Sequence, residues 1–230
     1  MSEGQAGSAI LRLTNLLDED SFVELGSLVT ARVTDFNLDP KQAPSDGVVT
    51  GHGLIDGRLV FVYSQDAGVL NGTIGEMHGK KIMEVYDKAM KMGAPVIGLI
   101  DCAGVRLQEA FDATETIGEI IAKACEASGV VPQILGVLGN CGGGLSMLPA
   151  LSDFVFMSKD AALYVNSPDA IGGNSREKKD TSSAVFQLEA GNVDAIGSEE
   201  EVLDKIRQMV AVLPSSSSTS PRNSMPALSV

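Results

Sequence analysis

The chain has 230 residues, a net charge of −13 and an apolar fraction of 44%. This length and composition are typical of one globular domain with a buried core, alone or with a tail. The excess of Asp and Glu argues against a nucleic-acid partner, because phosphate contacts need Lys and Arg. The sequence has no apolar run of about 18 residues and no basic-then-apolar start, so we expect neither a membrane span nor a signal peptide.

The cysteine pattern bears on the cell compartment. Cys102, Cys125 and Cys141 are odd in number, widely spaced and without a CxxC pair. This pattern argues against a zinc site and is typical of reduced thiols. We therefore expect a cytoplasmic protein without a metal.

Short apolar strands alternate with amphipathic helices along the chain. In chain order, the expected elements are a helix around 9–17, a hairpin at 47–63, a helix at 73–92, a strand at 95–101, a helix at 114–128, a strand at 132–139, a short helix after the glycines at 142–144, strands at 154–158 and 162–166, and a helix at 199–212. Near-continuous apolar strands between helices predict an α/β fold, with a largely parallel sheet that helices cover.

Local signals support several of these elements. Asp56-Gly57 is a dipeptide that accepts positive φ angles and favours a hairpin turn. Thr73 and Glu76 have the spacing of a capping box, and Gly93 fits the end of the same helix.

We divide the chain into one domain, residues 1–213, and a tail, residues 214–230. The tail is rich in Ser and Pro and has few apolar residues that could form a core. Such a composition is typical of disorder, so we expect residues 214–230 to be disordered.

Two loops are of interest because ligands of parallel α/β sheets bind beyond the carboxyl ends of the strands. Residues 101–110 read DCAGVRLQEA, and residues 139–147 read GNCGGGLSM. One strand–helix–strand unit separates the two loops. Their strands are therefore expected to be neighbours, with both loops at one edge of the sheet.

The glycine triplet 142–144 fits none of the common glycine motifs. No Lys follows it as a P-loop requires, no GxGxxG is present, and Ser146 lacks the second glycine of a GxSxG nucleophile elbow. A serine-based triad needs a base, and the two histidines, His52 and His78, lie in the N-terminal third of the chain. These absences leave backbone amides as the chemical groups of this loop.

Two interpretations of the glycines stay open. Glycines before a helix leave N–H groups free to bind an anion, and Gly104-Val105 offers a second donor from the neighbouring loop. Two convergent N–H groups would form an oxyanion hole. Alternatively, the triplet only lets a helix pack closely on a strand.

Three longer motifs around these loops resemble one family. They are FVYSQDAGVLNGTIGEMHGKKI, GAPVIGLIDCAGVRLQEA and SGVVPQILGVLGNCGGGLSMLPALSDFVFM. In this order they resemble segments of the carboxyltransferase subunits of biotin-dependent acyl-CoA carboxylases and decarboxylases. The similarity spans about residues 10–171 and implies the ClpP/crotonase-like fold of that family, with ββα units around a largely parallel sheet.

The resemblance implies an activity and a set of site residues. Such subunits bind an acyl-CoA, hold its enolate with backbone amides, and move a carboxyl group to or from carboxybiotin. On the family pattern the catalytic amides fall on Val105 and on Gly143 or Gly144. The implied substrate-binding residues are Gly72, Thr73, Lys80, Lys81, Gly104, Arg106 and Gly142.

Two roles are open for the three cations of this set. Lys80, Lys81 and Arg106 contact CoA phosphates in one interpretation. In the other, the lysines lie on a solvated helix face and Arg106 forms a structural ion pair.

The sequence departs from the family pattern in its length. A full carboxyltransferase carries two related halves, and this chain contains one. We therefore expect a hetero-oligomer in which a second carboxyltransferase subunit, of the C-terminal type, completes the site and a carrier protein brings the biotin. After residue 172 the resemblance weakens. Two alternatives are a malonate decarboxylase β-type subunit, which shares GVRLQEA and acts on a malonyl thioester of an acyl-carrier protein, and a non-catalytic scaffold.

Overall fold

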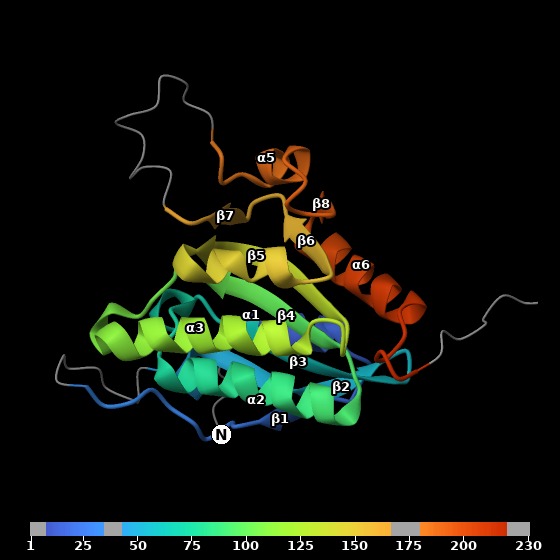
Figure 1. Ribbon diagram of the computed structural model, residues 1–230, viewed down its shortest axis with the longest axis horizontal. Coiled ribbons are helices and arrows are strands. Elements are labelled where there is room, and N and C mark those ends of the chain that lie inside the picture. The colour runs from blue at the N-terminus through green and yellow to red at the C-terminus, as the bar shows by residue number, and fades with distance from the viewer. Residues whose placement is uncertain (1–7, 35–42, 167–179, 220–230) are drawn as a thin grey trace, which may run out of the picture.

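A computed structural model describes residues 8–34, 43–166 and 180–219 (Figure 1). Its helices are α1 (Ser8–Leu16), α2 (Glu76–Met92), α3 (Ala110–Ala127), α5 (Ala184–Glu189) and α6 (Glu199–Val212). Its strands are β1 (Val23–Leu25), β2 (Val48–Ile55), β3 (Arg58–Gln65), β4 (Val96–Cys102), β5 (Gln133–Gly142), β6 (Phe154–Ser158), β7 (Ala162–Tyr164) and β8 (Ala195–Gly197).

The strands form one sheet in the order β1-β2-β3-β4-β5-β6-β8, and β7 pairs with the far end of β5. Neighbouring strands from β1 to β3 are antiparallel, whereas the pairings from β3 onward are parallel. This arrangement confirms the expected α/β class with a largely parallel sheet. Because β4 and β5 are parallel neighbours, the loops that follow them lie at the same edge.

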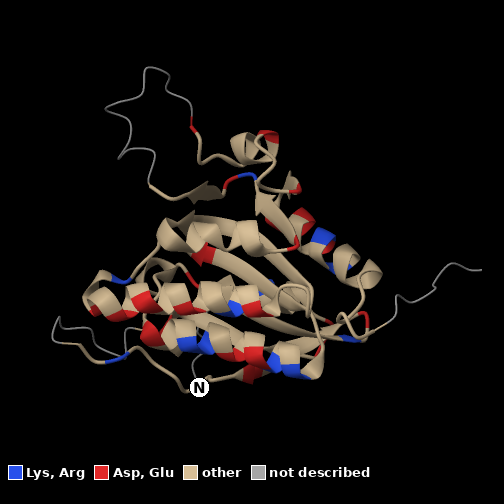
Figure 2. Cartoon of the chain, in the orientation of Figure 1, with Lys and Arg blue, Asp and Glu red and all other residues tan. Residues whose placement is uncertain are grey.

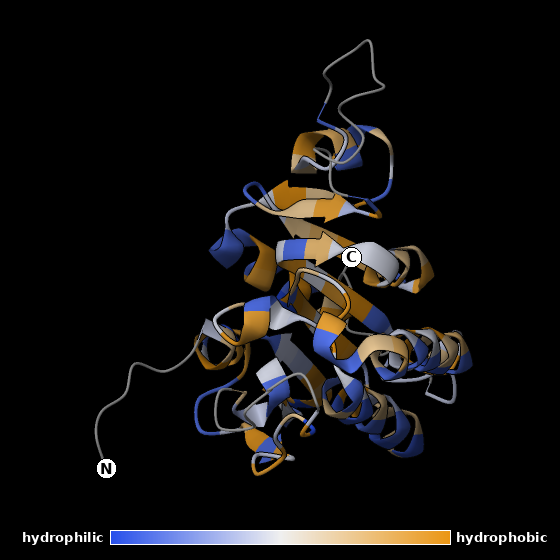
Figure 3. Cartoon of the chain, turned by 90° about the vertical axis from the view of Figure 1, so that its left-hand side faces the viewer, coloured by the Kyte–Doolittle hydropathy of each residue, from blue (hydrophilic) through white to orange (hydrophobic). Residues whose placement is uncertain are grey.

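Helices cover both faces of the sheet. On one face α2 and α3 lie side by side, and Tyr86 and Ile120 of these helices belong to one buried core cluster (Figure 1). On the other face α1 and α6 contribute Leu13 and Ile206 to a second cluster. A side view shows apolar strands between helices that also carry hydrophilic residues (Figure 3). Burial on both faces explains why the strands are near-continuous apolar runs in the sequence.

Several local signals are confirmed. Asp56 and Gly57 form the hairpin turn with φ angles of 50° and 74°. Gly93 follows α2 in the left-handed conformation, with a φ of 64°. The last helix has the predicted limits, and Ser198 and Glu201 form a capping box at its start.

The start of α2 differs from the expectation. Gly75 is the N-cap residue, and the Thr73 hydroxyl lies outside the helix, where it donates to the Leu70 carbonyl oxygen at 2.7 Å. The predicted capping box of Thr73 and Glu76 is therefore wrong. The Glu76 N–H instead donates to a carboxylate oxygen of Glu109 at 2.7 Å, so a tertiary contact replaces the local cap.

Two other helical segments also differ from the expectation. α3 begins at Ala110, not near residue 114. The segment after the glycines forms two 3₁₀ turns, Gly143–Met147 and Pro149–Leu151, in place of an α-helix. A helix running through Pro149 would lack a backbone donor, because proline has no N–H. The short elements β1, α5 and β8 were not predicted, since segments of three to six residues carry little periodicity.

Part of the predicted disordered tail packs on the domain. The Ser217 N–H donates to the Val130 carbonyl oxygen at 2.9 Å, and Ser216 is buried. Arg58 donates to the Ser215 hydroxyl at 3.2 Å. The prediction of disorder from residue 214 is thus wrong for 214–219, because backbone and hydroxyl groups fix this segment without apolar side chains. The remainder of the tail, 220–230, lies outside the described residues.

Candidate functional site

The loops after β4 and β5 meet at one edge of the sheet. Cys102 and Cys141 are paired across these strands where the loops begin. A Cβ on Gly104 would lie 3.5 Å from the Gly142 carbonyl oxygen, and a Cβ on Gly143 would lie 3.8 Å from the Gly104 Cα atom. The structure therefore brings together three of the glycines that the sequence marks as site residues.

The backbone around Val105 directs one N–H group away from the neighbouring segment. Ile74 and Val105 form a parallel bridge, in which the Ile74 N–H donates to the Gly104 carbonyl and the Arg106 N–H donates to the Ile74 carbonyl, both at 2.9 Å. Successive N–H groups of an extended segment point to opposite sides, so the Val105 N–H points away from Ile74. Val105 is half-buried, and its N–H has no acceptor within the described ranges.

Gly143 begins the 3₁₀ turn that faces this loop. Its φ of 65° is left-handed, a conformation that favours glycine. Gly143 and Gly144 are half-buried, and the first N–H groups of a helical turn have no acceptor inside the turn. The segment is a five-residue 3₁₀ turn and not the helix expected from the sequence, so the left-handed backbone at Gly143 orients these amides. The Ser146 hydroxyl donates to the Gly143 carbonyl at 2.7 Å, which holds the turn closed.

Gly72 and Thr73 lie against the same edge and contact the protein's own backbone. A Cβ on Gly72 would lie 2.0 Å from the Asp101 carbonyl oxygen, and the φ of Gly72 is 64°. Only glycine fits there. The Thr73 carbonyl accepts a hydrogen bond from the Arg106 guanidinium at 2.7 Å. Both residues thereby shape the backbone next to Val105.

Arg106 is fully buried in an ion cluster. Its guanidinium contacts the Asp46 carboxylate, lies 2.9 Å from a Glu109 carboxylate oxygen and donates to the Thr73 carbonyl. A buried guanidinium with these partners does not reach a CoA phosphate. The expectation of a substrate contact is therefore corrected for Arg106, and the structural ion pair is the role that the geometry supports.

The two adjacent lysines differ in their surroundings. The Lys81 ammonium is buried and donates to the Ser45 and Val48 carbonyls at 3.0 and 2.5 Å. Burial lowers the pKa of Lys81 to about 8. The expectation that Lys81 contacts CoA or lies on a solvated face is corrected for the same reason. Lys80 is exposed beside Glu76, on a helix where charges of both signs are mixed (Figure 2).

The buried histidine and thiols under the loops are held in their neutral forms. His78 Nδ1 lies 2.8 Å from the Asp46 carbonyl oxygen, and His78 Nε2 lies 3.0 Å from the Gln65 amide nitrogen. Burial lowers the pKa of His78 to about 3. Burial also raises the pKa of Cys102 to about 12 and raises that of Cys141. At neutral pH these groups therefore carry no charge.

Sequence reasoning missed two buried charges beneath the glycine loop. Arg12 of α1 pairs with Asp101 at the end of β4 at 3.0 Å and with Glu199 of α6 at 3.2 Å. The second Asp101 oxygen accepts the Asn140 N–H at 3.2 Å. The partners of Arg12 are 89 and 187 residues away in the sequence, so no local motif marks them. The available signal was a charged residue at the end of an apolar strand.

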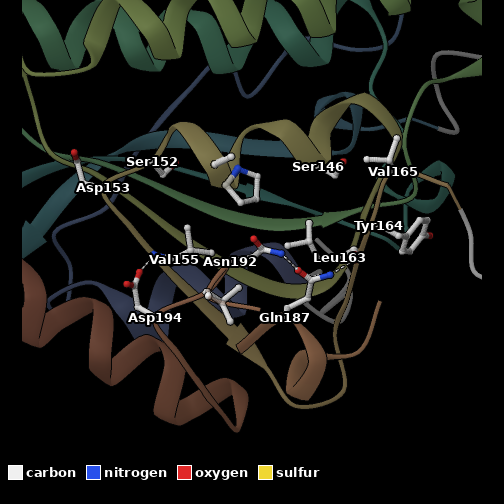
Figure 4. Close-up of a pocket in the computed structure, with 14 residues that line it drawn as sticks. Ser146, Ser152, Asp153, Val155, Leu163, Tyr164, Val165, Gln187, Asn192 and Asp194 are labelled. Atoms are coloured by element: carbon white, nitrogen blue, oxygen red, sulfur yellow. Dashed lines mark hydrogen bonds between the residues drawn. The ribbon is translucent and has the colours of Figure 1, made fainter. Parts of the chain in front are cut away.

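A cavity of about 520 Å³ opens beside the glycine turn (Figure 4). Tyr164 of β7 lines it and is paired with Gly142, so one wall is joined to the turn. In Figure 4, Ser146 and Tyr164 lie toward one end and Asp153 and Asp194 toward the other. The volume is in the range of about 300–1,000 Å³ that is common for small-molecule sites.

A comparison with family models identifies the family of this chain. Residues 3–229 match the model described as carboxyl transferase domain. The chain belongs to the carboxyl transferase domain family. The propionyl-CoA carboxylase beta chain of Roseobacter denitrificans is 42% identical, over 88% of this chain and 41% of that protein. The methylmalonyl-CoA decarboxylase subunit alpha of Veillonella parvula is 41% identical, over 89% of this chain and 41% of that protein. The chain spans about two fifths of the length of these relatives.

Solved carboxyl transferase structures have the same fold. Transcarboxylase 12S with hydrolysed methylmalonyl-coenzyme A matches with a TM-score of 0.89 and 34% identity, over 93% of this chain and 43% of that one. A Pseudomonas malonate decarboxylase hetero-tetramer matches with a TM-score of 0.77 and 25% identity, over 95% of this chain and 85% of that one. The crotonase-like fold that the sequence resemblance implied is thereby confirmed.

The described ranges contain neither a candidate membrane span nor a candidate metal centre. None of the helices described there is both long and apolar enough to span a bilayer. Over the same ranges, no group of three or more His, Cys, Asp or Glu side chains is placed to hold a metal ion.

Proposed function

We propose that the chain is a carboxyltransferase half-subunit that binds an acyl-CoA and stabilises its enolate with backbone amides during carboxyl transfer to or from carboxybiotin. The observation that carries the proposal is the close approach of the Gly104-Val105 backbone to the turn that begins at Gly143, at the carboxyl ends of β4 and β5. Membership of the carboxyl transferase domain family supports it. Similarity to the propionyl-CoA carboxylase beta chain supports it as well.

In this proposal the amides act on the thioester oxygen. The N–H groups of Val105 and of Gly143 or Gly144 donate to this oxygen, on which negative charge develops as the enolate forms. One such donor contributes about 2.7–4 kcal/mol of transition-state stabilisation. Lys80 is the exposed cation of the expected set that remains a candidate for a CoA phosphate.

Biotin, brought by a carrier protein, supplies the carboxyl donor or acceptor of this reaction. We assign the amides of Val105 and Gly143 to the thioester oxygen, and the biotin contacts to a second carboxyltransferase subunit of the C-terminal type. A cytoplasmic location remains a prediction that cell fractionation tests.

A reconstitution experiment tests the proposed function. The purified chain is mixed with the second carboxyltransferase subunit of its gene neighbourhood, the biotin carrier protein and methylmalonyl-CoA labelled in its free carboxyl group. We expect label on the carrier only when both subunits are present. A folded complex of both subunits that transfers no label from methylmalonyl-CoA or malonyl-CoA would contradict the proposal.

A decarboxylase subunit is the second candidate, because the chain is similar to a Pseudomonas malonate decarboxylase and to a methylmalonyl-CoA decarboxylase subunit alpha. The same amides would then stabilise the enolate left when a malonyl thioester on an acyl-carrier protein loses CO₂. Release of CO₂ from that thioester without any biotin protein would favour this candidate over the first.

A further inference from the structure

A continuous chain of buried polar residues, joined through both side-chain and backbone groups, runs beneath the candidate amide donors. Its members come from several segments that are distant in the sequence, and all of them are buried. In order of contact they are Arg106, Asp46, His78, Gln65, Asp101 and Arg12. None of them lines the cavity beside the glycine turn.

Arg106 contacts the Asp46 carboxylate, and the links from Asp46 onward to Arg12 are hydrogen bonds of ordinary length. The backbone N–H of His78 donates to the Asp46 carboxylate at 2.6 Å, and His78 Nε2 lies 3.0 Å from the Gln65 amide nitrogen. The Gln65 amide oxygen in turn accepts the Asp101 N–H at 3.2 Å, and Asp101 pairs with Arg12 at 3.0 Å. Helix α2 and strands β3 and β4 are thereby joined under the site.

Each end of the buried chain holds one donor segment. Arg106 directly follows Val105, and its guanidinium is fixed by Asp46, Glu109 and the Thr73 carbonyl. At the other end, Asp101 accepts the Asn140 N–H, two residues before the glycine triplet. A Cβ at residue 139 would lie 2.0 Å from an Asp101 carboxylate oxygen, so this carboxylate packs directly on the β5 backbone.

We propose that Arg106 and Asp101 are positioning residues that set the Val105 and Gly143–Gly144 amides at their mutual distance through this buried chain. The inference rests on the proposed function, because it assigns these side chains a role at the same oxyanion site. Neither side chain touches the substrate, and both act through the backbone of the donors. A displacement of about 1 Å at a reacting centre costs on the order of 100-fold in rate.

Burial of this many charges is explained better by geometry than by stability. A buried ion pair is often no more stable than well-packed apolar side chains of similar volume. A guanidinium is planar and holds several acceptors at fixed angles, which an ammonium group does not do. His78 in the middle of the chain stays neutral because burial lowers its pKa to about 3. His78, in the middle of the buried chain, therefore keeps one charge state near neutral pH.

The test uses a CoA thioether that ends in a nitroethyl group. Its nitronate anion carries negative charge on oxygen, as an enolate does, and absorbs in the ultraviolet. On the full chain we expect the bound nitro group to ionise at a lower pH than the free compound. In Arg106→Lys, nitronate affinity should fall about 10- to 100-fold while the affinity for CoA itself is unchanged.

Further variants separate positioning from folding. Glu109→Gln and Asp101→Asn keep the shapes of the side chains and remove one charge each, and thermal unfolding shows whether every variant folds. If Arg106→Lys does not fold, Glu109→Gln decides the question. The matched control is Arg207→Lys, because Arg207 also holds two carboxylates, Asp18 and Asp56, and one carbonyl, but at the opposite edge of the sheet.

The outcomes distinguish this inference from the proposed function. Unchanged nitronate affinity and ionisation in a folded Arg106→Lys or Glu109→Gln protein overturns the positioning role and leaves the proposed function intact. An equal loss in Arg207→Lys also overturns it, since general destabilisation then explains the effect. If the unaltered chain does not favour the nitronate over the neutral nitro compound, the amide site is wrong and both proposals fall.

Discussion

At the residue scale, Ala110 holds a backbone conformation that glycine adopts more easily. Its φ is 47° and its ψ is −117°, between Glu109 of the buried ion cluster and the first turn of α3. A non-glycine residue in such a region costs on the order of 1–3 kcal/mol and persists only where the surroundings fix it. Here Glu109 must reach Arg106 and the Glu76 N–H while the helix begins at the next residue.

The strain at Ala110 predicts a stabilising substitution. We expect Ala110→Gly to raise the free energy of unfolding by about 1 kcal/mol, because the released strain exceeds the entropy that glycine loses on folding. Urea unfolding measures the change. The control is Ala211→Gly on an exposed position of α6, which should lower the free energy of unfolding by about 1 kcal/mol. A similar loss in both variants would show that Ala110 is not strained.

The buried His78 predicts a pH dependence of stability. Burial lowers the pKa of His78 from 6.5 to about 3, so the unfolded chain binds this proton first as the pH falls. The free energy of unfolding should therefore fall with decreasing pH from about 6.5 to about 3, by up to about 1.4 kcal/mol per pH unit.

The measurement compares the unaltered chain with His78→Gln between pH 7 and pH 5, where most Asp and Glu side chains stay ionised. From pH 7 to pH 5, the free energy of unfolding of the unaltered chain should fall by about 2 kcal/mol more than that of His78→Gln. Parallel pH curves for the two proteins would rule out His78 as the cause.

At the scale of elements, sequence signals succeeded where they were local. Gly93 marks the end of α2 by its own conformational freedom, and the apolar periodicity of α6 is complete within its range. The start of α2 was mispredicted because Glu109, far along the chain, caps it. The glycine loops of the site were found by motif and strand order, whereas Arg12 and Asp101 were missed because their contacts exist only after folding.

The capping box of α6 predicts a cost for losing its hydroxyl. The Glu201 N–H donates to the Ser198 hydroxyl at 3.2 Å, and the Ser198 N–H donates to the Glu201 carboxylate at 2.7 Å. Ser198→Ala should lower the free energy of unfolding by about 1 kcal/mol in urea. Thr14→Ala is the control, because Thr14 is exposed within α1 and caps nothing, so it should cost little. Equal losses would mean that the cap contributes nothing specific.

At the scale of the whole molecule, the proposed site lies beside exposed apolar side chains. Leu107, which directly follows the buried Arg106, is 83% exposed, and Phe111 in the first turn of α3 is 88% exposed. Large apolar side chains next to a functional site are typical of protein contacts. In the proposed function, a second carboxyltransferase subunit must reach the same edge of the sheet to place biotin near the enolate. We therefore expect Phe111 to be buried by that subunit.

This expectation predicts a selective loss of association. Burial of a phenylalanine side chain contributes about 1.5–3 kcal/mol, so Phe111→Ser should weaken binding of the second subunit about 10- to 100-fold. Sedimentation of mixtures of the two chains measures the affinity. The matched control is Met92→Ser, because Met92 is 61% exposed at the end of α2 that lies away from the loops. Equal affinity in Phe111→Ser and Met92→Ser would place the subunit contact elsewhere, since an interface over the amide loops cannot leave Phe111 in water.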